Sequence, residues 1–267
     1  MDKQHTKTFI ITGAASGLGR EIGMMLIEKG HRGVFVDVNG PGDDLKSFIE
    51  RHAGEVEFFQ QDIKDIRAME ELIRLCYERF GRIDMLVNNA ALKVFEPFEC
   101  LSDDLCSESY KVNVLAPMQL CRLVLPYMKS QRRGYIVNIA SRSGLRGYAD
   151  GSLYCGTKAA LIAFSESLSK EVIGTGLHVY ALCPTLLDPE DPLRVNHRKA
   201  FAESIGYDRV CRVVESIILE KALPREPIVV IFSFSMLLKI LAKTFIRCFH
   251  WICQYIAQKI EILGYKR

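Results

Sequence analysis

Short apolar runs alternate along this chain with longer stretches in which apolar residues recur at helical spacing. The runs are rich in Val, Ile and Phe, as strands are, and they fall at residues 8–12, 33–37, 56–60, 83–87, 134–139, 177–183 and 228–232. Those at 83–87 and 134–139 are almost continuously apolar, which is typical of strands covered on both faces. The alternation predicts an α/β fold, with a single doubly wound parallel sheet of about seven strands and helices on both faces.

A different pattern occupies residues 235–267. Apolar side chains recur there every three or four residues, at Leu238, Leu241, Phe245, Phe249, Ile252, Ile256, Ile260 and Leu263. Polar side chains keep the same period on the other side, at Lys239, Lys243, Arg247, His250, Gln254, Gln258 and Glu261. We therefore expect one domain over residues 1–234, followed by a long C-terminal amphipathic helix with a basic polar face.

Composition and charge agree with this division. With 267 residues, of which 49% are hydrophobic and 25% charged, the chain can bury one large core. The net charge of +3 divides into +5 on residues 236–267 and −2 on residues 1–235. A basic tail on a slightly acidic domain favours an anionic lipid surface over nucleic acid, for which the chain has no motif.

Two arrangements of this tail stay open. It can pack on its own domain or on a second subunit, or it can lie in the plane of a membrane or lipid-droplet surface, with Trp251 and Tyr255 near the interface. We favour the second, which makes the protein cytoplasmic and peripheral on a membrane or lipid surface. A spanning helix is disfavoured, because the longest uncharged run, residues 227–238, has twelve residues and a bilayer requires ~18–20.

A glycine-rich turn follows the first expected strand. Gly13, Gly17 and Gly19, with Ser16 and Leu18 among them, separate that strand from a helical pattern. Such a junction binds phosphate, because glycine lets the ligand approach the backbone and the helix dipole favours its negative charge.

Asp37 ends the next expected strand, where a carboxylate can accept hydrogen bonds from ribose hydroxyls. Its charge repels a 2′-phosphate, and Val38 and Asn39 supply no cation to hold one. We therefore expect NAD as the cofactor. NADP is the less favoured alternative, because Arg20 and Arg32 are close in the sequence.

Tyr154 and Lys158 lie four residues apart, with Ser141 thirteen residues before the tyrosine. Residues at this spacing share one face of a helix, so the ammonium group can favour the phenolate. A free tyrosine has a pKa of about 10. A cation about 4 Å away contributes up to ~4 kcal/mol at an effective dielectric constant near 20. The pair therefore predicts a tyrosine suited to proton transfer.

These features occur with others in a fixed order, and together they resemble the short-chain dehydrogenase/reductase family, which has an NAD(P)-binding Rossmann fold. The resemblance covers roughly residues 7–185. Its motifs are Thr12-Gly13-Ala14-Ala15-Ser16-Gly17-Leu18-Gly19, Asp62, Asn88-Asn89-Ala90-Ala91, Asn113, Ile136-Val137-Asn138-Ile139-Ala140-Ser141, and Tyr154 with Lys158.

The resemblance implies roles for these residues. Tyr154 would exchange a proton with the substrate oxygen, Ser141 would hydrogen-bond that oxygen, and Lys158 would hold the nicotinamide ribose and lower the tyrosine pKa. Asn113 would anchor a water of a proton relay. The implied cofactor-binding set is Gly13, Ser16, Gly17, Leu18, Gly19, Asp37, Asp62, Ile63, Asn89, Ala90, Tyr154, Lys158 and Pro184. Residues 1–234 would form the dinucleotide-binding catalytic domain.

The chain departs from the family pattern at three places. Ala91 replaces the last glycine of Asn-Asn-Ala-Gly. The usual Asn-Pro-Gly reads Cys183-Pro184-Thr185, and the threonine that often binds the nicotinamide carboxamide a few residues later is absent. The C-terminus also differs from the ending of soluble members.

Cysteine and histidine usage adds little chemistry. The nine cysteines are scattered and odd in number, which favours a reducing compartment and a role as small core residues. The six histidines have no metal-ligand spacing, so we expect no metal site.

The predicted function is that of an NAD(H)-dependent oxidoreductase interconverting an alcohol and a carbonyl. The tail is similar in pattern to the C-termini of lipid-active retinol and steroid dehydrogenases, which favours a retinoid, steroid or fatty substrate at a membrane surface. Two alternatives are a soluble reductase of a polar substrate and a non-catalytic dinucleotide sensor or scaffold. The resemblance also implies a homodimer or tetramer.

Overall fold

A computed structural model of the full chain describes residues 6–185, 206–221, 224 and 226–231. The expected tail helix of residues 235–267 lies outside the described residues. The strands are β1 (Thr8–Thr12), β2 (Arg32–Asp37), β3 (Val56–Gln60), β4 (Met85–Asn88), β5 (Gly134–Ile139), β6 (Leu177–Pro184) and β7 (Ile228–Ile231). The helices are α1 (Gly17–Glu28), α2 (Asp43–Arg51), α3 (Ile66–Phe80), α4 (Asp103–Tyr110), α5 (Ala116–Gln131), α6 (Ser152–Glu171) and α8 (Tyr207–Ile218).

The seven strands form one sheet in the order β3-β2-β1-β4-β5-β6-β7, and every neighbouring pair is parallel. The expected doubly wound α/β fold is therefore confirmed, and strand positions agree with the sequence pattern within one or two residues. The largest difference is at β4, which begins at Met85 instead of residue 83. The backbone of Asp84 nevertheless hydrogen-bonds to both neighbouring strands. Its N–H donates to Thr8 O at 2.7 Å, and its carbonyl accepts from Tyr135 N at 2.8 Å.

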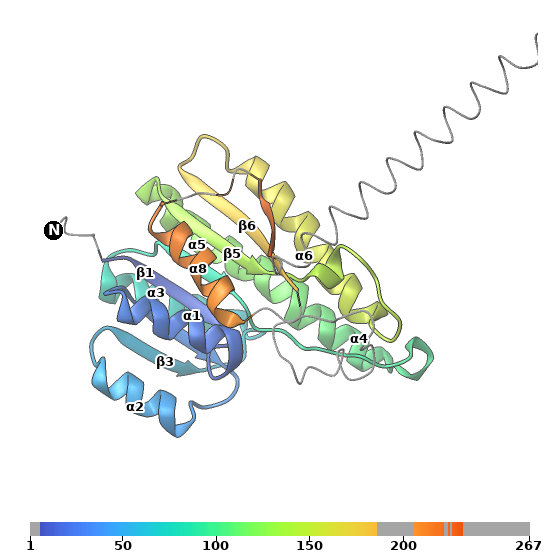
Figure 1. Cartoon of the computed structure of the whole chain (residues 1–267). Helices are drawn as coiled ribbons and strands as arrows, with labels where there is room; N and C mark the ends of the chain where they lie inside the picture. The colour runs from blue at the N-terminus through green and yellow to red at the C-terminus, as the bar shows by residue number, and fades with distance from the viewer. Residues whose placement is uncertain (1–5, 186–205, 222–223, 225, 232–267) are drawn as a thin grey trace, which may run out of the picture.

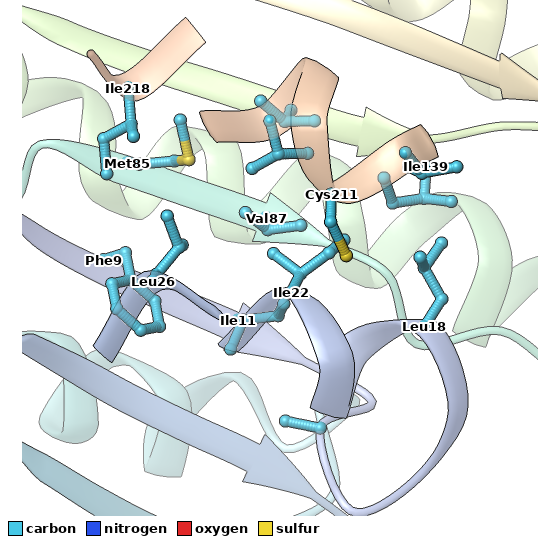
Figure 2. Close-up of a cluster of buried hydrophobic side chains, with 14 of the residues drawn as sticks. Phe9, Ile11, Leu18, Ile22, Leu26, Met85, Val87, Ile139, Cys211 and Ile218 are labelled. Carbon is cyan, nitrogen blue, oxygen red and sulfur yellow. The ribbon is translucent and has the colours of Figure 1, made fainter. Parts of the chain in front are cut away.

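Side chains of each central strand alternate between two buried layers, as the apolar runs require. Phe9 and Ile11 of β1 belong to the layer beneath α1 and α8, whereas Ile10 belongs to the opposite layer with α3 and α5. Figure 1 shows α1 and α8 side by side on one face of the sheet. Figure 2 shows part of their layer, with Phe9, Ile11, Met85 and Val87 of the sheet near Leu18, Ile22, Leu26, Cys211 and Ile218 of the helices.

Local signals fix the ends of the helices. The side chain of Asp65 accepts a bond from Ala68 N at 3.1 Å at the start of α3, and Gly81 ends that helix in the left-handed region, with φ of 72°. Ser102 begins α4 in the same manner as Asp65, by accepting from Leu105 N. Asp65 and Ser102 thus mark where α3 and α4 begin, and Gly81 marks where α3 ends.

The strand order reverses between β1 and β4, since the chain runs outward through β2 and β3 before returning beside β1. In parallel sheets of this kind a ligand binds at the carboxyl ends of the strands, next to such a reversal.

The described residues also bear on the expected roles of the cysteines and of membrane-spanning helices. Five of the seven described cysteines are buried, as expected of core residues. No helix within the described ranges is both long and apolar enough to cross a membrane.

Candidate active site

A pocket of about 610 Å³ lies at the carboxyl edge of the sheet. Its walls come from the ends of β1, β2, β4, β5 and β6 and from the first turns of α1 and α6. Most of the predicted site residues line it, namely Gly13, Ser16, Gly17, Leu18, Asp37, Asp62, Ile63, Asn89, Ala90, Ser141, Tyr154, Lys158 and Pro184. Gly19 and Asn113 do not line the pocket, but each contacts a residue that does. Gly19 packs against Gly13, and the Asn113 side chain binds the backbone of Leu92.

The glycine turn is packed too closely for side chains. Gly13 has φ of 67°, and a Cβ there would lie 2.8 Å from the Ala90 Cα. A Cβ on Gly19 would lie 2.1 Å from Gly13 O, so only glycine lets α1 approach the turn. Helix α1 begins at Gly17, and the side chain of Ser16 makes no capping bond there. The first amides of the helix are therefore available to an anion in the pocket.

Thr12 and Asn89 fasten this turn to the end of β4. Asn89 donates from Nδ2 to Thr12 O and Gly13 O, each at 3.0 Å. Thr12 Oγ1 accepts from the amides of Asn89 and Ala90, at 3.0 and 3.1 Å. The Asn89 side chain thus holds the glycine turn in place, in addition to lining the pocket.

Asp37 lies at the end of β2 and is buried, with 9% of the residue exposed. One oxygen accepts from Ala15 N and the other from Asn39 N, both at 2.9 Å. The two arginines that left NADP open are directed elsewhere. Arg32 donates to Phe80 O at 2.8 Å, and Arg20 pairs with Glu21 at 3.1 Å.

The predicted adenine residue Asp62 belongs to an ion-pair cluster. Its carboxylate accepts from the Lys64 backbone at 2.9 Å and lies 3.4 Å from Lys64 Nζ. Lys64 also pairs with Glu108 of α4, and hydrogen bonding to Glu108 raises the pKa of Lys64 above its ordinary value. Both partners line the pocket. Sequence reasoning missed Lys64 and Glu108, because 44 residues separate them and no local pattern connects them.

Tyr154 and Lys158 share one face of α6, as their spacing predicts. Lys158 Nζ lies 5.7 Å from the centroid of the Tyr154 ring and donates to Ile139 O at 2.7 Å. The ring of Tyr154 meets Phe95 edge-on, with centroids 5.1 Å apart. Burial, and secondarily the charge of Lys93, lowers the pKa of Lys158 to about 8. The lysine is therefore a buried cation beside the phenol.

Ser141 follows β5 and opens a short helical turn. Its hydroxyl oxygen accepts from Ser143 N at 3.1 Å, which fixes the side chain on the pocket wall. The next residue, Arg142, also lines the pocket and donates to the Tyr148 hydroxyl at 2.7 Å. Arg142 directly follows the predicted site residue Ser141, and this is the one signal that could have indicated it. Its place in the pocket wall is seen only in the structure.

Asn113 lies in a π-helical stretch, Lys111–Leu115, between α4 and α5. Its side-chain amide pairs with both backbone groups of Leu92, accepting at 2.7 Å and donating at 2.8 Å. It also donates to Thr157 Oγ1 of α6 at 3.1 Å. The side chain thus ties the loop after β4 to the helix that carries Tyr154. Its role as anchor of a proton-relay water stays a prediction.

Comparison with known proteins identifies relatives of this chain. Residues 7–198 match the family described as short chain dehydrogenase. An uncharacterized oxidoreductase of Thermotoga maritima is 33% identical over 179 residues, which cover 67% of this chain and 70% of that protein. A 3-ketodihydrosphingosine reductase of Bacteroides thetaiotaomicron is 30% identical over a segment that covers 68% of this chain and 62% of the reductase.

A solved structure shares the fold. The 3-ketoacyl-(acyl-carrier-protein) reductase of Brucella melitensis, complexed with NADH, superposes with a TM-score of 0.74 at 23% identity. The superposition covers 85% of this chain and 97% of that one.

Because the charge of Lys158 is buried, we expect the protein to unfold less readily when that charge is removed. Its native pKa of about 8 lies below the ordinary 10.5, so the protonated lysine destabilises the fold below pH 8. This cost declines as the pH rises from 8 to 10.5. We expect Lys158→Met to raise the free energy of unfolding at pH 7 by roughly 1–3 kcal/mol, a figure that includes the cost of losing the bond to Ile139 O. Near pH 10 this stabilisation should disappear.

Thermal unfolding at pH 7 and pH 10 tests this expectation. Lys46→Met is the matched control, because Lys46 is exposed on α2 and pairs only loosely with Asp43 at 3.2 Å. A Lys158→Met protein that is less stable than wild type at pH 7, or equally shifted at both pH values, contradicts it.

Proposed function

Because the chain belongs to the short-chain dehydrogenase family, whose oxidoreductases use NAD(P), we propose that it interconverts an alcohol and a carbonyl with NAD(H), using Tyr154 as acid and base. One observation carries the proposal. Tyr154, Lys158 and Ser141 line the same pocket as the glycine turn and Asp37. A proton-transfer group and a phosphate-binding turn thus share a single cavity, as hydride transfer between a dinucleotide and a bound alcohol requires.

The residues of the pocket fit a dinucleotide. The first amides of α1, at Gly17 and Leu18, would hold the pyrophosphate. Asp37 would accept from the adenosine ribose, while Asp62 and Ile63 would contact the adenine. When bound, the nicotinamide would supply a hydride during reduction and accept one during oxidation. Residues 1–234 would then form the catalytic domain.

Proton transfer would be carried out by side chains of α6 and of the turn that follows β5. During reduction, Tyr154 would give its phenolic proton to the substrate oxygen, and Ser141 would donate a hydrogen bond to the same oxygen. The ammonium of Lys158 lies beside the ring and would stabilise the phenolate that remains. Asn113 would keep this arrangement in place through Leu92 and Thr157. Oxidation would run through the same groups in reverse.

Two features support NAD over NADP. Asp37 lines the pocket, and its carboxylate would accept from the adenosine ribose and repel a 2′-phosphate. Arg20 and Arg32, the cations nearest in sequence, are engaged with Glu21 and with the Phe80 carbonyl. Lys64 is a cation in the pocket wall, but it lies between two carboxylates, those of Asp62 and Glu108.

The substrate we propose is lipophilic and is met at a membrane or lipid surface. The basic amphipathic pattern of residues 235–267 supports this, and so does the relative named for a ketosphingoid substrate. A homodimer or tetramer built on α4, α5 and α6 is also proposed. The exposed apolar side chains of Tyr110, Leu115 and Met118 along this face support an assembly.

Removing the phenolic hydroxyl should abolish turnover without abolishing cofactor binding. We expect Tyr154→Phe to lower kcat by about 10²–10⁴-fold while the Kd for NADH stays within about twofold, because the group acts on a proton of the substrate. NADH formation from NAD is measured with retinoid, steroid, fatty and short polar alcohols. Tyr77→Phe, a ring packed on Tyr127 at 4.7 Å, is the control and should keep full activity.

The outcomes separate the candidate functions. Equal turnover by Tyr154→Phe and wild type would remove the tyrosine from the mechanism. A wild-type protein that binds NADH but turns over no alcohol of the panel would favour the dinucleotide sensor over an enzyme.

Asp37→Asn should shift cofactor preference. The amide keeps one acceptor for Ala15 N but lacks the charge that repels a 2′-phosphate. We expect the ratio of NADPH to NADH affinity to rise about tenfold, as measured by calorimetry. Asp44→Asn on the exposed face of α2 should leave the ratio unchanged. An unchanged ratio in Asp37→Asn would show that the carboxylate does not select the cofactor.

The membrane proposal predicts binding to anionic vesicles. The full chain should float with vesicles that contain phosphatidylserine, and added salt should weaken this binding. A form that ends at residue 235 should stay unbound and still bind NADH. Flotation of both forms, or of neither, would contradict a membrane role for the tail.

A further inference from the structure

The hydroxyl of Thr185 is an unsatisfied polar group inside the pocket. Thr185 lines the cavity directly after β6, and its side chain is largely buried, with 6% of the residue exposed. Its Oγ1 atom is buried and has no hydrogen-bond partner among the residues that the structure describes. Its backbone is fixed, because its amide donates to Ile231 O at 3.3 Å. A buried hydroxyl without a partner destabilises a protein, so a ligand that supplies the partner would recover that cost.

The position of Thr185 indicates which part of the ligand it would meet. Strand β6 pairs with β5, with Ile139 opposite Leu182, and Ile139 O holds the ammonium of Lys158. Thr185 therefore lies at the end of the pocket that contains Ser141 and Tyr154. The adenosine end, marked by Asp37, is at β2, and β1, β4 and β5 lie between β2 and β6.

We propose that the Thr185 hydroxyl binds the carboxamide of the nicotinamide ring and so orients the ring toward Tyr154. The inference rests on the proposed function, since it concerns the same cofactor. A hydroxyl can both donate and accept a hydrogen bond, and a carboxamide offers an acceptor oxygen and a donor nitrogen. Thr185 thereby acquires a role at a position that sequence comparison marks only as a departure from the family pattern.

The test compares two ligands on three variants of the full chain. Thr185→Val removes the hydroxyl and keeps the shape, Thr185→Ser keeps the hydroxyl, and Thr175→Val removes a hydroxyl outside the pocket. The ligands are NADH and ADP-ribose, which lacks the nicotinamide, and calorimetry gives each Kd. We expect Thr185→Val to weaken NADH about tenfold and ADP-ribose less than twofold, with Thr185→Ser close to wild type and Thr175→Val unchanged.

Unfolding of the free protein provides a readout that a purely structural role would not reproduce. Thr185→Val should be at least as stable as wild type without ligand, because it loses an unpaired buried hydroxyl. Thr175→Val should be less stable, because Thr175 Oγ1 donates to Val172 O at 2.6 Å. The stabilisation that saturating NADH gives should be smaller in Thr185→Val than in wild type.

Three results would overturn the inference. They are an unchanged NADH Kd in Thr185→Val, an equal loss for NADH and ADP-ribose, and a lower stability of the free Thr185→Val protein. Failure of the proposed function is distinct from these, since the wild-type chain would then not bind NADH at all.

Discussion

The parallel pairing of all seven strands is the constraint on which the site depends. Because every strand points the same way, the residues that follow β1, β2, β4, β5 and β6 meet at one edge, although they are spread over more than half of the chain. A buried polar network keeps β4, β5 and α6 in register beneath the pocket. Asn88 Nδ2 donates to Asn138 Oδ1 at 2.8 Å, and Asn138 Nδ2 donates to Ser165 Oγ at 2.8 Å. Strand β5 leads to Ser141 and α6 carries Tyr154, so this network fixes the two groups relative to each other.

The pocket contains two features that lower the stability of the free protein. Lys158 is a buried cation whose pKa is lowered to about 8, and its ammonium donates to a backbone carbonyl at 2.7 Å. Thr185 carries a buried hydroxyl for which the described part of the chain supplies no hydrogen-bond partner. Both lie at the end of the cavity where Tyr154 and Ser141 are found, and a bound cofactor would compensate both. Concentration of such costs in one cavity is typical of sites that are shaped for a ligand and not for the stability of the empty fold.

Much of the fold and many of the site residues could be predicted from the sequence, because local patterns specify them. The strands follow from apolar runs, the anion-binding turn from three glycines, and the pairing of Tyr154 with Lys158 from helical spacing. Contacts between distant segments could not be predicted in this way. Glu108 of α4 pairs with Lys64 in the turn after β3, Asn113 binds the backbone of Leu92, and the charge of Lys93 acts on Lys158. These contacts depend on how α4, α5 and α6 pack, and no periodicity of the chain encodes that packing. The expected tail helix lies outside the described residues, so it stays a prediction.

The most direct test is a crystal structure of the full chain grown with saturating NADH. We expect a single dinucleotide in this pocket, with its pyrophosphate at the Gly17 and Leu18 amides and its adenosine beside Asp37 and Asp62. The nicotinamide would then lie among Ser141, Tyr154 and Thr185. A pocket that stays empty at saturating NADH would show that it is not a dinucleotide site, and a dinucleotide bound in the opposite direction would contradict the roles given to Asp37 and Tyr154.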